Sequence, residues 1–177
     1  TEICISSLLH GVTTNELAAA KLEATAKAST VIDDFSHGLR DWYQMQAGNL
    51  PHQETWTRKL TDPMYRGAPG AKLKFTLTMP ITNRLTFVVT ENEWRSYRGQ
   101  RKTYTCTREI AGADSARSLT FEPADFISTE AKEGSLKSWS EIDQLGICAH
   151  YGKGANATKD APSWNGPAAT FVRLEWA

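Results

Sequence analysis

Apolar and polar residues alternate along most of the chain beyond residue 30, which is the pattern of strands covered on one side. In the segment 71–79 one face carries Leu73, Phe75, Leu77 and Met79, and the other carries Lys72, Lys74, Thr76 and Thr78. The segment 84–91 repeats this alternation after a break at Pro80, Thr82 and Asn83. The two segments are therefore predicted to form an antiparallel hairpin that lies on a core.

Glycine, proline, asparagine and aspartate separate the alternating segments from one another, as expected for turns. The predicted strands are 31–35, 42–46, 55–61, 71–79, 84–91, 102–109, 117–121, 145–151 and 170–176. A single helical turn is expected at 135–144, before the penultimate strand. Many short strands with little helix among them predict an all-β domain, built as a two-sheet antiparallel sandwich.

The first 29 residues follow a different pattern, which is rich in alanine. Thr13 and Glu16 form a capping box, and the residues that follow favour a helix over about 15–27. Its only large apolar residues are Leu17 and Leu22, so this helix buries little surface by itself. We therefore expect an N-terminal extension or linker helix at 1–29 and a sandwich domain at 30–177. The helix either connects to a neighbouring domain or docks on the sandwich.

The charge balance narrows the range of partners. Twenty basic and twenty acidic residues give the chain a formal net charge of zero, which argues against nucleic acid or a membrane surface as a partner. No apolar run approaches the roughly 20 residues that span a bilayer, and no signal-peptide pattern is present. If the protein is exported, its signal has been removed or the sequence belongs to a longer chain.

The cysteines Cys4, Cys106 and Cys148 are odd in number and widely spaced, with no C-x-x-C motif. Buried free thiols are the favoured interpretation. Cys106 and Cys148 each lie in a predicted strand, so a disulfide between them in an oxidising compartment is the alternative.

Motifs typical of catalysis are missing from the sequence. There is no G-x-S-x-G elbow, no glycine-rich phosphate loop and no H-E-x-x-H motif, and the histidines are dispersed. Carboxylate pairs such as Glu91 and Glu93 leave a small hydrolase as one alternative. The chain is therefore predicted to be a binding protein and not an enzyme.

The segment after residue 91 combines aromatic rings with forked polar groups. Sugars present C–H patches that pack on aromatic faces and hydroxyls that need donors and acceptors. The predicted ligand-binding residues are Trp94, Tyr97, Arg95, Arg98, Trp56 and Asn92. Trp139 and Trp176 are expected in the core, and one of Trp42 and Tyr43 must face inward because neighbours on a strand point to opposite sides.

A cation site is the second candidate. Asp33, Asp34, the carbonyl of Gly38, Asp41 and Glu175 supply hard oxygen ligands of the kind that calcium prefers. If the first and last strands are neighbours, these groups converge, and a structural Ca²⁺ would offset their repulsion. The alternative is that the aspartates cap turns and Glu175 pairs with Arg173 or a lysine.

Several motifs together resemble a known family: VIDDFSHGLRDWY, WTRKLTDPMYRGAPGAKLKFTL, and SLTFEPADFIS with LKSWSEIDQLGI. They are similar to the galactose-binding-like jelly-roll domains that serve as carbohydrate-binding modules beside bacterial polysaccharide-degrading enzymes. The similarity runs from about Thr30 to the C-terminus. It rests on Asp33, Asp34 and Phe35; on Gly70 and Leu73; and on Pro123, Asp125 and Phe126.

This resemblance implies a jelly-roll sandwich that binds a polysaccharide or oligosaccharide on its concave sheet face or on the loops at one end. It also implies calcium near the terminal strands, an adjacent catalytic domain in the parent chain, and a secreted or periplasmic location. The arginines Arg84, Arg95, Arg98 and Arg101 depart from the pattern of a neutral-glucan binder and suit carboxylated or sulfated sugars as well. A structural accessory domain that packs on a catalytic domain without its own ligand is the alternative function.

Overall fold

The computed structural model describes residues 31–45, 54–130, 134–149, 151 and 166–177. The strands are β1 (Val31–Asp33), β2 (Glu54–Thr57), β3 (Leu73–Met79), β4 (Asn83–Glu91), β5 (Lys102–Ile110), β6 (Ala113–Phe121), β7 (Ile127–Ser128), β8 (Ile142–Cys148) and β9 (Thr170–Trp176). Short 3₁₀ helices lie at η1 (Lys59–Thr61), η2 (Pro63–Tyr65) and η3 (Pro123–Asp125). The predicted N-terminal helix falls in residues 1–29, which lie outside the described residues.

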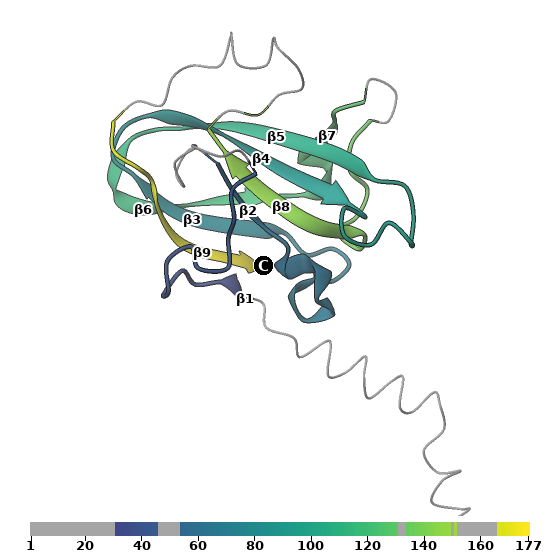
Figure 1. Ribbon diagram of the computed structural model, residues 1–177. Helices are drawn as coiled ribbons and strands as arrows, with labels where there is room; N and C mark the ends of the chain where they lie inside the picture. Colours follow the sequence, from purple (N-terminus) through teal and green to yellow (C-terminus); the bar gives the residue numbers. More distant parts are fainter. Residues whose placement is uncertain (1–30, 46–53, 131–133, 150, 152–165) are drawn as a thin grey trace, which may run out of the picture.

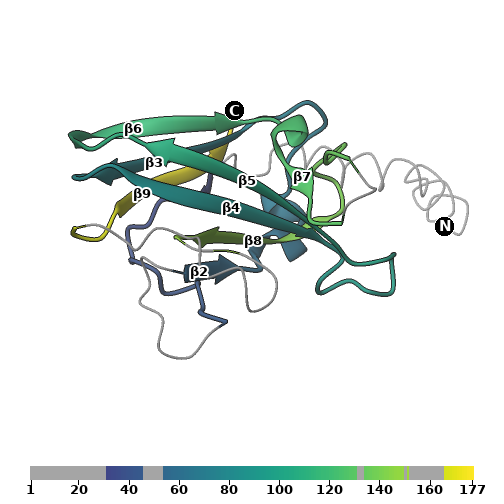
Figure 2. The same cartoon turned by 90° about the horizontal axis from the view of Figure 1, so that it is seen from above.

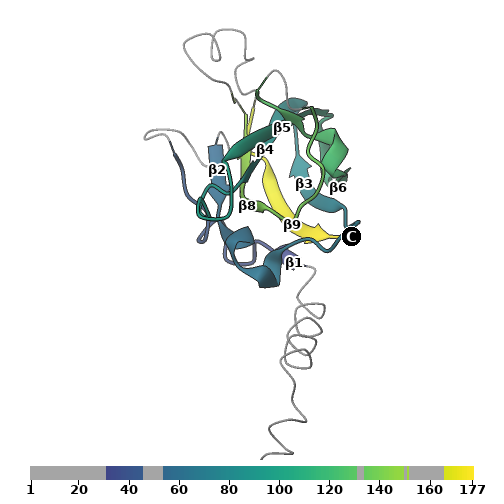
Figure 3. The same ribbon diagram turned by 90° about the vertical axis from the view of Figure 1, so that its right-hand side faces the viewer.

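The strands form two antiparallel sheets that face each other across the core (Figure 3). One sheet has the order β1-β9-β3-β6, and the other has the order β2-β8-β4-β5-β7. The predicted all-β sandwich of two antiparallel sheets is confirmed, and the strand order is consistent with a jelly roll. Within the described ranges, no helix has the length and apolar character that crossing a membrane requires.

The predicted hairpin of 71–79 with 84–91 is wrong, because these two strands belong to different sheets. β3 pairs with β6 and β9, whereas β4 pairs with β5 and β8 (Figures 1 and 2). The apolar faces of the two strands meet across the core instead, with the rings of Phe75 and Phe87 at 5.6 Å between centroids. The alternation of residues tells which face of a strand is covered, but not which strand lies beside it.

Aromatic rings run through the core from one sheet to the other. Phe87 of β4 contacts Phe121 of β6 at 4.6 Å, and the series continues through Phe126 to Trp139 and Trp176. Both indoles are buried and donate N–H bonds to main-chain carbonyls, Trp139 to Ala71 and Trp176 to Tyr65. The predicted core positions of Trp139 and Trp176 are confirmed, and their bonds fix the loops at one end of the sandwich.

Some predicted boundaries differ from those observed. The strand predicted at 55–61 ends at Thr57, where the Thr57 side chain accepts a bond from the Lys59 amide and the chain turns into η1. In the segment predicted at 42–46, the described residues form a single bridge, between Tyr43 and Trp56. Where a helical turn was predicted at 135–144, Ser135 forms a bridge with Ile127, a hydrogen bond from Ile142 N to Trp139 O closes a short turn, and β8 begins at Ile142.

The two described cysteines are free and buried, as predicted. Cys106 belongs to the core between the sheets, and Cys148 lies with Trp56 and Val88 in a separate cluster. Burial raises the pKa of both thiols, so each stays protonated near neutral pH. Cys4 lies outside the described residues.

Candidate functional site

The connection between β4 and β5 is a loop that carries the predicted ring and charge cluster. Asn92 opens this loop with a φ of 54°, a left-handed conformation that asparagine tolerates better than most residues. Its amide N–H donates to Glu141 O, and its side-chain Nδ2 donates to Gln100 O at 3.4 Å. Asn92 therefore joins the two ends of the loop and does not project from it.

Asp143 of β8 anchors this loop by hydrogen bonds and is fully buried. One carboxylate oxygen accepts the amide of Glu93 and the other accepts the amide of Trp94, both at 2.9 Å. The second oxygen also accepts Arg95 Nε at 3.3 Å. Because three consecutive residues are tied to a single carboxylate, the backbone that presents the Trp94 ring is fixed in position.

A surface groove of about 700 Å³ lies beside Trp94, at the end of the sandwich where η1 and η2 meet the β4–β5 loop. Its lining is aromatic and charged, and includes Trp42, Tyr43, Tyr65, Trp94, Arg40, Asp41, Arg58, Lys59 and Asp62. Trp94 is 45% exposed, so part of the residue is open to solvent. We call this feature the Trp94 groove. Its size is that of a small-molecule site.

Arg58 lies over the Trp94 ring, with its guanidinium carbon 5.6 Å from the ring centroid. It follows β2 directly, and its carbonyl accepts bonds from both the amide and the hydroxyl of Thr61. The backbone of Arg58 is therefore fixed, and its guanidinium makes a cation–π contact with the indole. Arg58 is exposed to solvent.

Tyr43 closes the groove beside Trp94, with the two rings edge to face at 6.4 Å. Its backbone exchanges two hydrogen bonds with Trp56, and its hydroxyl oxygen accepts Gln144 Nε2 at 2.8 Å. Burial raises the pKa of the Tyr43 phenol, so the hydroxyl keeps its proton at neutral pH. With its oxygen already accepting from Gln144, this hydroxyl is left as a donor to a ligand.

Within the described chain, several buried polar atoms of the β4–β5 loop and of β8 have no hydrogen-bond partner. Among the described residues, these include Gln144 Oε1, Asn92 Oδ1 and both terminal nitrogens of Arg95. Most buried polar groups in folded proteins are satisfied, so a cluster of exceptions calls for a water, an ion or a ligand. This end of the sandwich therefore retains unused hydrogen-bonding capacity.

The predicted ligand-binding residues divide into exposed and buried groups. Trp94 and Tyr97 are exposed, as expected, and Tyr97 is 84% exposed but does not line the groove. Arg98 is exposed and lies 3.5 Å from Glu141. In contrast, Arg95 and Asn92 are buried, at 4% and 5% exposure, so their predicted contact with a ligand stays a prediction without support from this geometry.

Trp56 is also buried, at 3% exposure, so its predicted contact with a ligand is likewise a prediction without support from this geometry. Its ring lies against Gly146, where an added Cβ would come within 2.4 Å of the ring atoms. Its indole N–H donates to Glu54 Oε1 at 2.7 Å. Trp56 therefore packs on β8 and supports Tyr43 through the backbone bridge.

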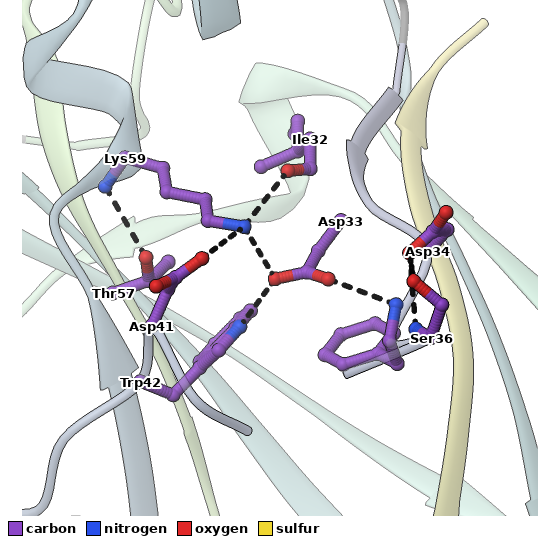
Figure 4. Close-up of polar contacts among 9 residues, drawn as sticks. Ile32, Asp33, Asp34, Ser36, Asp41, Trp42, Thr57 and Lys59 are labelled. Carbon is purple, nitrogen blue, oxygen red and sulfur yellow. Dashed lines mark hydrogen bonds and ion pairs between the residues drawn. The ribbon is translucent and has the colours of Figure 1, made fainter. Parts of the chain in front are cut away.

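The carboxylates predicted to bind calcium have partners within the protein (Figure 4). Lys59 Nζ lies between Asp33 and Asp41, at 2.7 and 3.3 Å from their oxygens. The same Asp33 oxygen accepts the Trp42 indole N–H, and its other oxygen accepts the Phe35 amide. The ammonium group of Lys59 thus supplies the positive charge that the sequence assigned to Ca²⁺.

Of the remaining predicted calcium ligands, Asp34 and Gly38 line one pocket with Asp33, Asp41 and Lys59, whereas Glu175 is not part of its lining. Asp34 turns away and bonds to Ser36, which lowers its pKa, and Glu175 pairs with Arg173 and Lys74. Gly38 has a positive φ of 65° and forms a turn with Phe35. Among the residues that the structure describes, no three histidine, cysteine or acidic side chains are placed to share a metal ion. Calcium at Asp33, Asp34, Gly38, Asp41 and Glu175 stays a prediction, without support from this geometry.

The other carboxylate pair, Glu91 and Glu93, is likewise engaged. Glu91 accepts the Tyr104 hydroxyl at 3.3 Å, and Glu93 contacts Arg101. Sequence reasoning included Tyr43 among the candidate aromatic residues but missed Arg58 as a groove residue. Arg58 has no local signal, because it is brought to Trp94 by β2, which pairs with β8. To place Arg58 in a turn, the sequence analysis would have had to end the strand at Thr57, where β2 ends.

Comparisons with protein-family models, with curated proteins and with solved structures find no significant match to this chain. The resemblance to carbohydrate-binding modules therefore stays a prediction from the sequence motifs, and the candidate site rests on the geometry of the Trp94 groove.

Proposed function

We propose that the chain is a non-catalytic carbohydrate-binding module, and that the Trp94 groove holds the sugar. The observation that carries this proposal is the exposed Trp94 ring at the wall of a groove that also contains fixed hydrogen-bonding groups. A pyranose places C–H groups on an aromatic face and directs its hydroxyls sideways. In the groove, Trp94 offers an aromatic face to the C–H groups. Arg58, the Tyr43 hydroxyl and the Asp62 carboxylate offer hydrogen-bonding groups to the sugar hydroxyls.

The rigidity of the groove supports the same function. Asp143 fixes the backbone of Trp94, Trp56 fixes that of Tyr43, and Thr61 fixes that of Arg58. A site whose groups are already in place loses less conformational entropy when the ligand binds. We still expect modest affinity, because the groove is open to solvent and a bound sugar would displace water from only one side of the Trp94 ring.

The test is affinity electrophoresis and calorimetry on a panel of neutral and acidic polysaccharides, with Trp94→Ala as the principal variant. We expect retention of the wild type on at least one polymer and a loss of about 10-fold or more in Trp94→Ala, since stacking contacts of this size contribute more than 1 kcal/mol. Tyr97→Ala tests whether the exposed loop tip adds to binding.

Ile81→Ala is the matched control. Ile81 is also an exposed large apolar residue, but it precedes β4, whereas Trp94 follows it, and β4 has nine residues. The two side chains are therefore about 30 Å apart along the strand. Unchanged retention in Ile81→Ala is expected. Absence of retention of the folded wild type on every polymer would overturn the proposal and favour an accessory domain that packs on a neighbour.

A further inference from the structure

The charged side chains in and around the Trp94 groove differ in how their charge is neutralised. Lys59 is held by Asp33 and Asp41, and Asp62 accepts the Met64 amide at 2.9 Å. Among the described residues, neither Arg40 nor Arg58 forms an ion pair, and both are exposed on the groove wall. The groove therefore presents two guanidinium groups whose charge no carboxylate of the described chain neutralises.

Arg58 is the better placed of the two arginines for recognition. Its guanidinium carbon lies 5.6 Å from the centroid of the Trp94 ring and the residue is exposed, so N–H donors of the group remain available to another partner. Tyr43 lines the same groove as Arg58, so its hydroxyl adds a neutral donor to the site. A planar fork of donors on a fixed base matches a carboxylate, whose two oxygens accept both bonds in one plane.

We propose that the Trp94 groove recognises an acidic sugar, with Arg58 receiving the carboxylate of a uronic-acid unit. This inference rests on the proposed carbohydrate-binding function and specifies its ligand class. Trp94 carries the pyranose ring, Arg58 binds the carboxylate as a charged fork, and the Tyr43 hydroxyl donates to an oxygen of the same unit.

The other charges in the groove favour a carboxylate over a dense array of sulfates. Asp62 and Asp41 lie on the same wall, and their negative charge would repel a ligand that carries several sulfate groups on each sugar. One carboxylate on a sugar unit matches the single stacked guanidinium. Arg40 is left to contact a neighbouring unit of the chain.

The test compares acidic polymers with their own methyl esters: polygalacturonate, alginate and glucuronoxylan, each in both forms, and heparin as the sulfated probe. Esterification removes the charge but keeps the backbone, so a carboxylate contact is isolated from ring stacking. We expect the wild type to bind at least one free acid about 10- to 100-fold more tightly than its ester, the ratio expected for a hydrogen bond to a charged group. Binding should weaken with added salt.

Arg58→Gln is the diagnostic variant, because it keeps a polar side chain but removes the charge. It should bind the acid and the ester nearly equally, whereas Arg84→Gln should behave like the wild type, since exposed Arg84 lies at the opposite end of β4 from Trp94. Near-ultraviolet circular dichroism checks that each variant is folded.

Each result has a distinct meaning. Equal binding of acid and ester by the wild type, with loss in Trp94→Ala, overturns the acidic specificity but keeps the carbohydrate-binding function. Preference for heparin over every uronic-acid polymer overturns the carboxylate assignment. No binding to any polymer overturns the carbohydrate-binding function itself, and the inference with it.

Discussion

Two arginines beside Trp94 use the same functional group in opposite ways. Arg95 follows Trp94 in the sequence, is 4% exposed and contacts the fully buried Asp143. Arg58 comes from a different part of the chain, lies over the Trp94 ring and is exposed. The first guanidinium holds the loop in place, and the second is available to a ligand. The arginine nearest to the key aromatic residue in sequence is therefore not the one positioned to bind.

The difference follows from the partner that the fold supplies to each arginine. Burying a charge is costly unless an opposite charge and hydrogen bonds accompany it, so Arg95 is tied to Asp143. A contact between an exposed guanidinium and an exposed ring requires no such desolvation, so Arg58 keeps hydrogen-bonding groups in water. Breaking the contact that each arginine makes should therefore have very different effects on the free energy of unfolding.

The largest effect is expected for Asp143→Ala. It leaves the Arg95 charge buried without its partner and the amides of Glu93 and Trp94 without an acceptor. We expect the free energy of unfolding to fall by about 3–5 kcal/mol, measured by urea denaturation. Asp143→Asn, which keeps an acceptor but not the charge, should lose less. A loss below that of Arg58→Ala would contradict the structural role given to the buried pair.

An intermediate effect is expected for Asp33→Ala, because Asp33 is only partly buried. Its side chain is 10% exposed and bonds to Lys59, the Trp42 indole and the Phe35 amide. We expect a loss of about 1–3 kcal/mol in unfolding free energy by the same measurement. If calcium bound here, the wild type would also be stabilised by added Ca²⁺, and a melting temperature that is the same with Ca²⁺ and with chelator would exclude that role.

The stabilisation that the Lys59 ammonium gains from Asp33 and Asp41 should depend on pH. Burial lowers the pKa of Lys59, but the hydrogen bonds and charges of Asp33 and Asp41 raise it by more, so the net pKa lies above the ordinary value. The stabilisation is therefore complete below the unfolded-state value, about pH 10.4, and is lost as the pH rises through the higher folded-state value. The difference in unfolding free energy between the wild type and Lys59→Met should shrink over this alkaline range. A constant difference would show that the charge contributes nothing.

The smallest change in stability is expected for Arg58→Ala. An exposed cation over an aromatic ring contributes about 0.5–1 kcal/mol, and no ion pair of Arg58 within the described chain is lost. The same urea titration measures it, with Arg84→Ala as the exposed control. A loss comparable with that of Asp143→Ala would assign Arg58 a structural role and weaken its assignment to the ligand.

The architecture was largely predictable from the sequence, because alternation reports which residues are covered. Leu73, Phe75, Leu77 and Met79 are all buried, as their spacing predicted. Strand neighbours were not predictable in the same way. β3 was assigned to β4 because a short turn joins them, and a short turn also fits a crossing from one sheet to the other.

The candidate site was predictable only in part. The exposure of Trp94 and Tyr97 follows from the loss of alternation after Glu91, and this signal was correct. The burial of Arg95 and Asn92 depends on Asp143 and Gln100, which no local pattern connects with them. The role of Arg58 depends on a contact between the end of β2 and the β4–β5 loop, which only the assembled sheets create.

The place of β9 in its sheet has a consequence for how the chain is made. This strand lies between β1 and β3, and Leu73 pairs with Trp176. During synthesis, one edge of β3 therefore stays unpaired until residues 170–176 have emerged from the ribosome. Topologies that rely on such distant pairings fold slowly and expose strand edges meanwhile. Shortening the chain before residue 170 would therefore remove an interior strand and leave β1 detached.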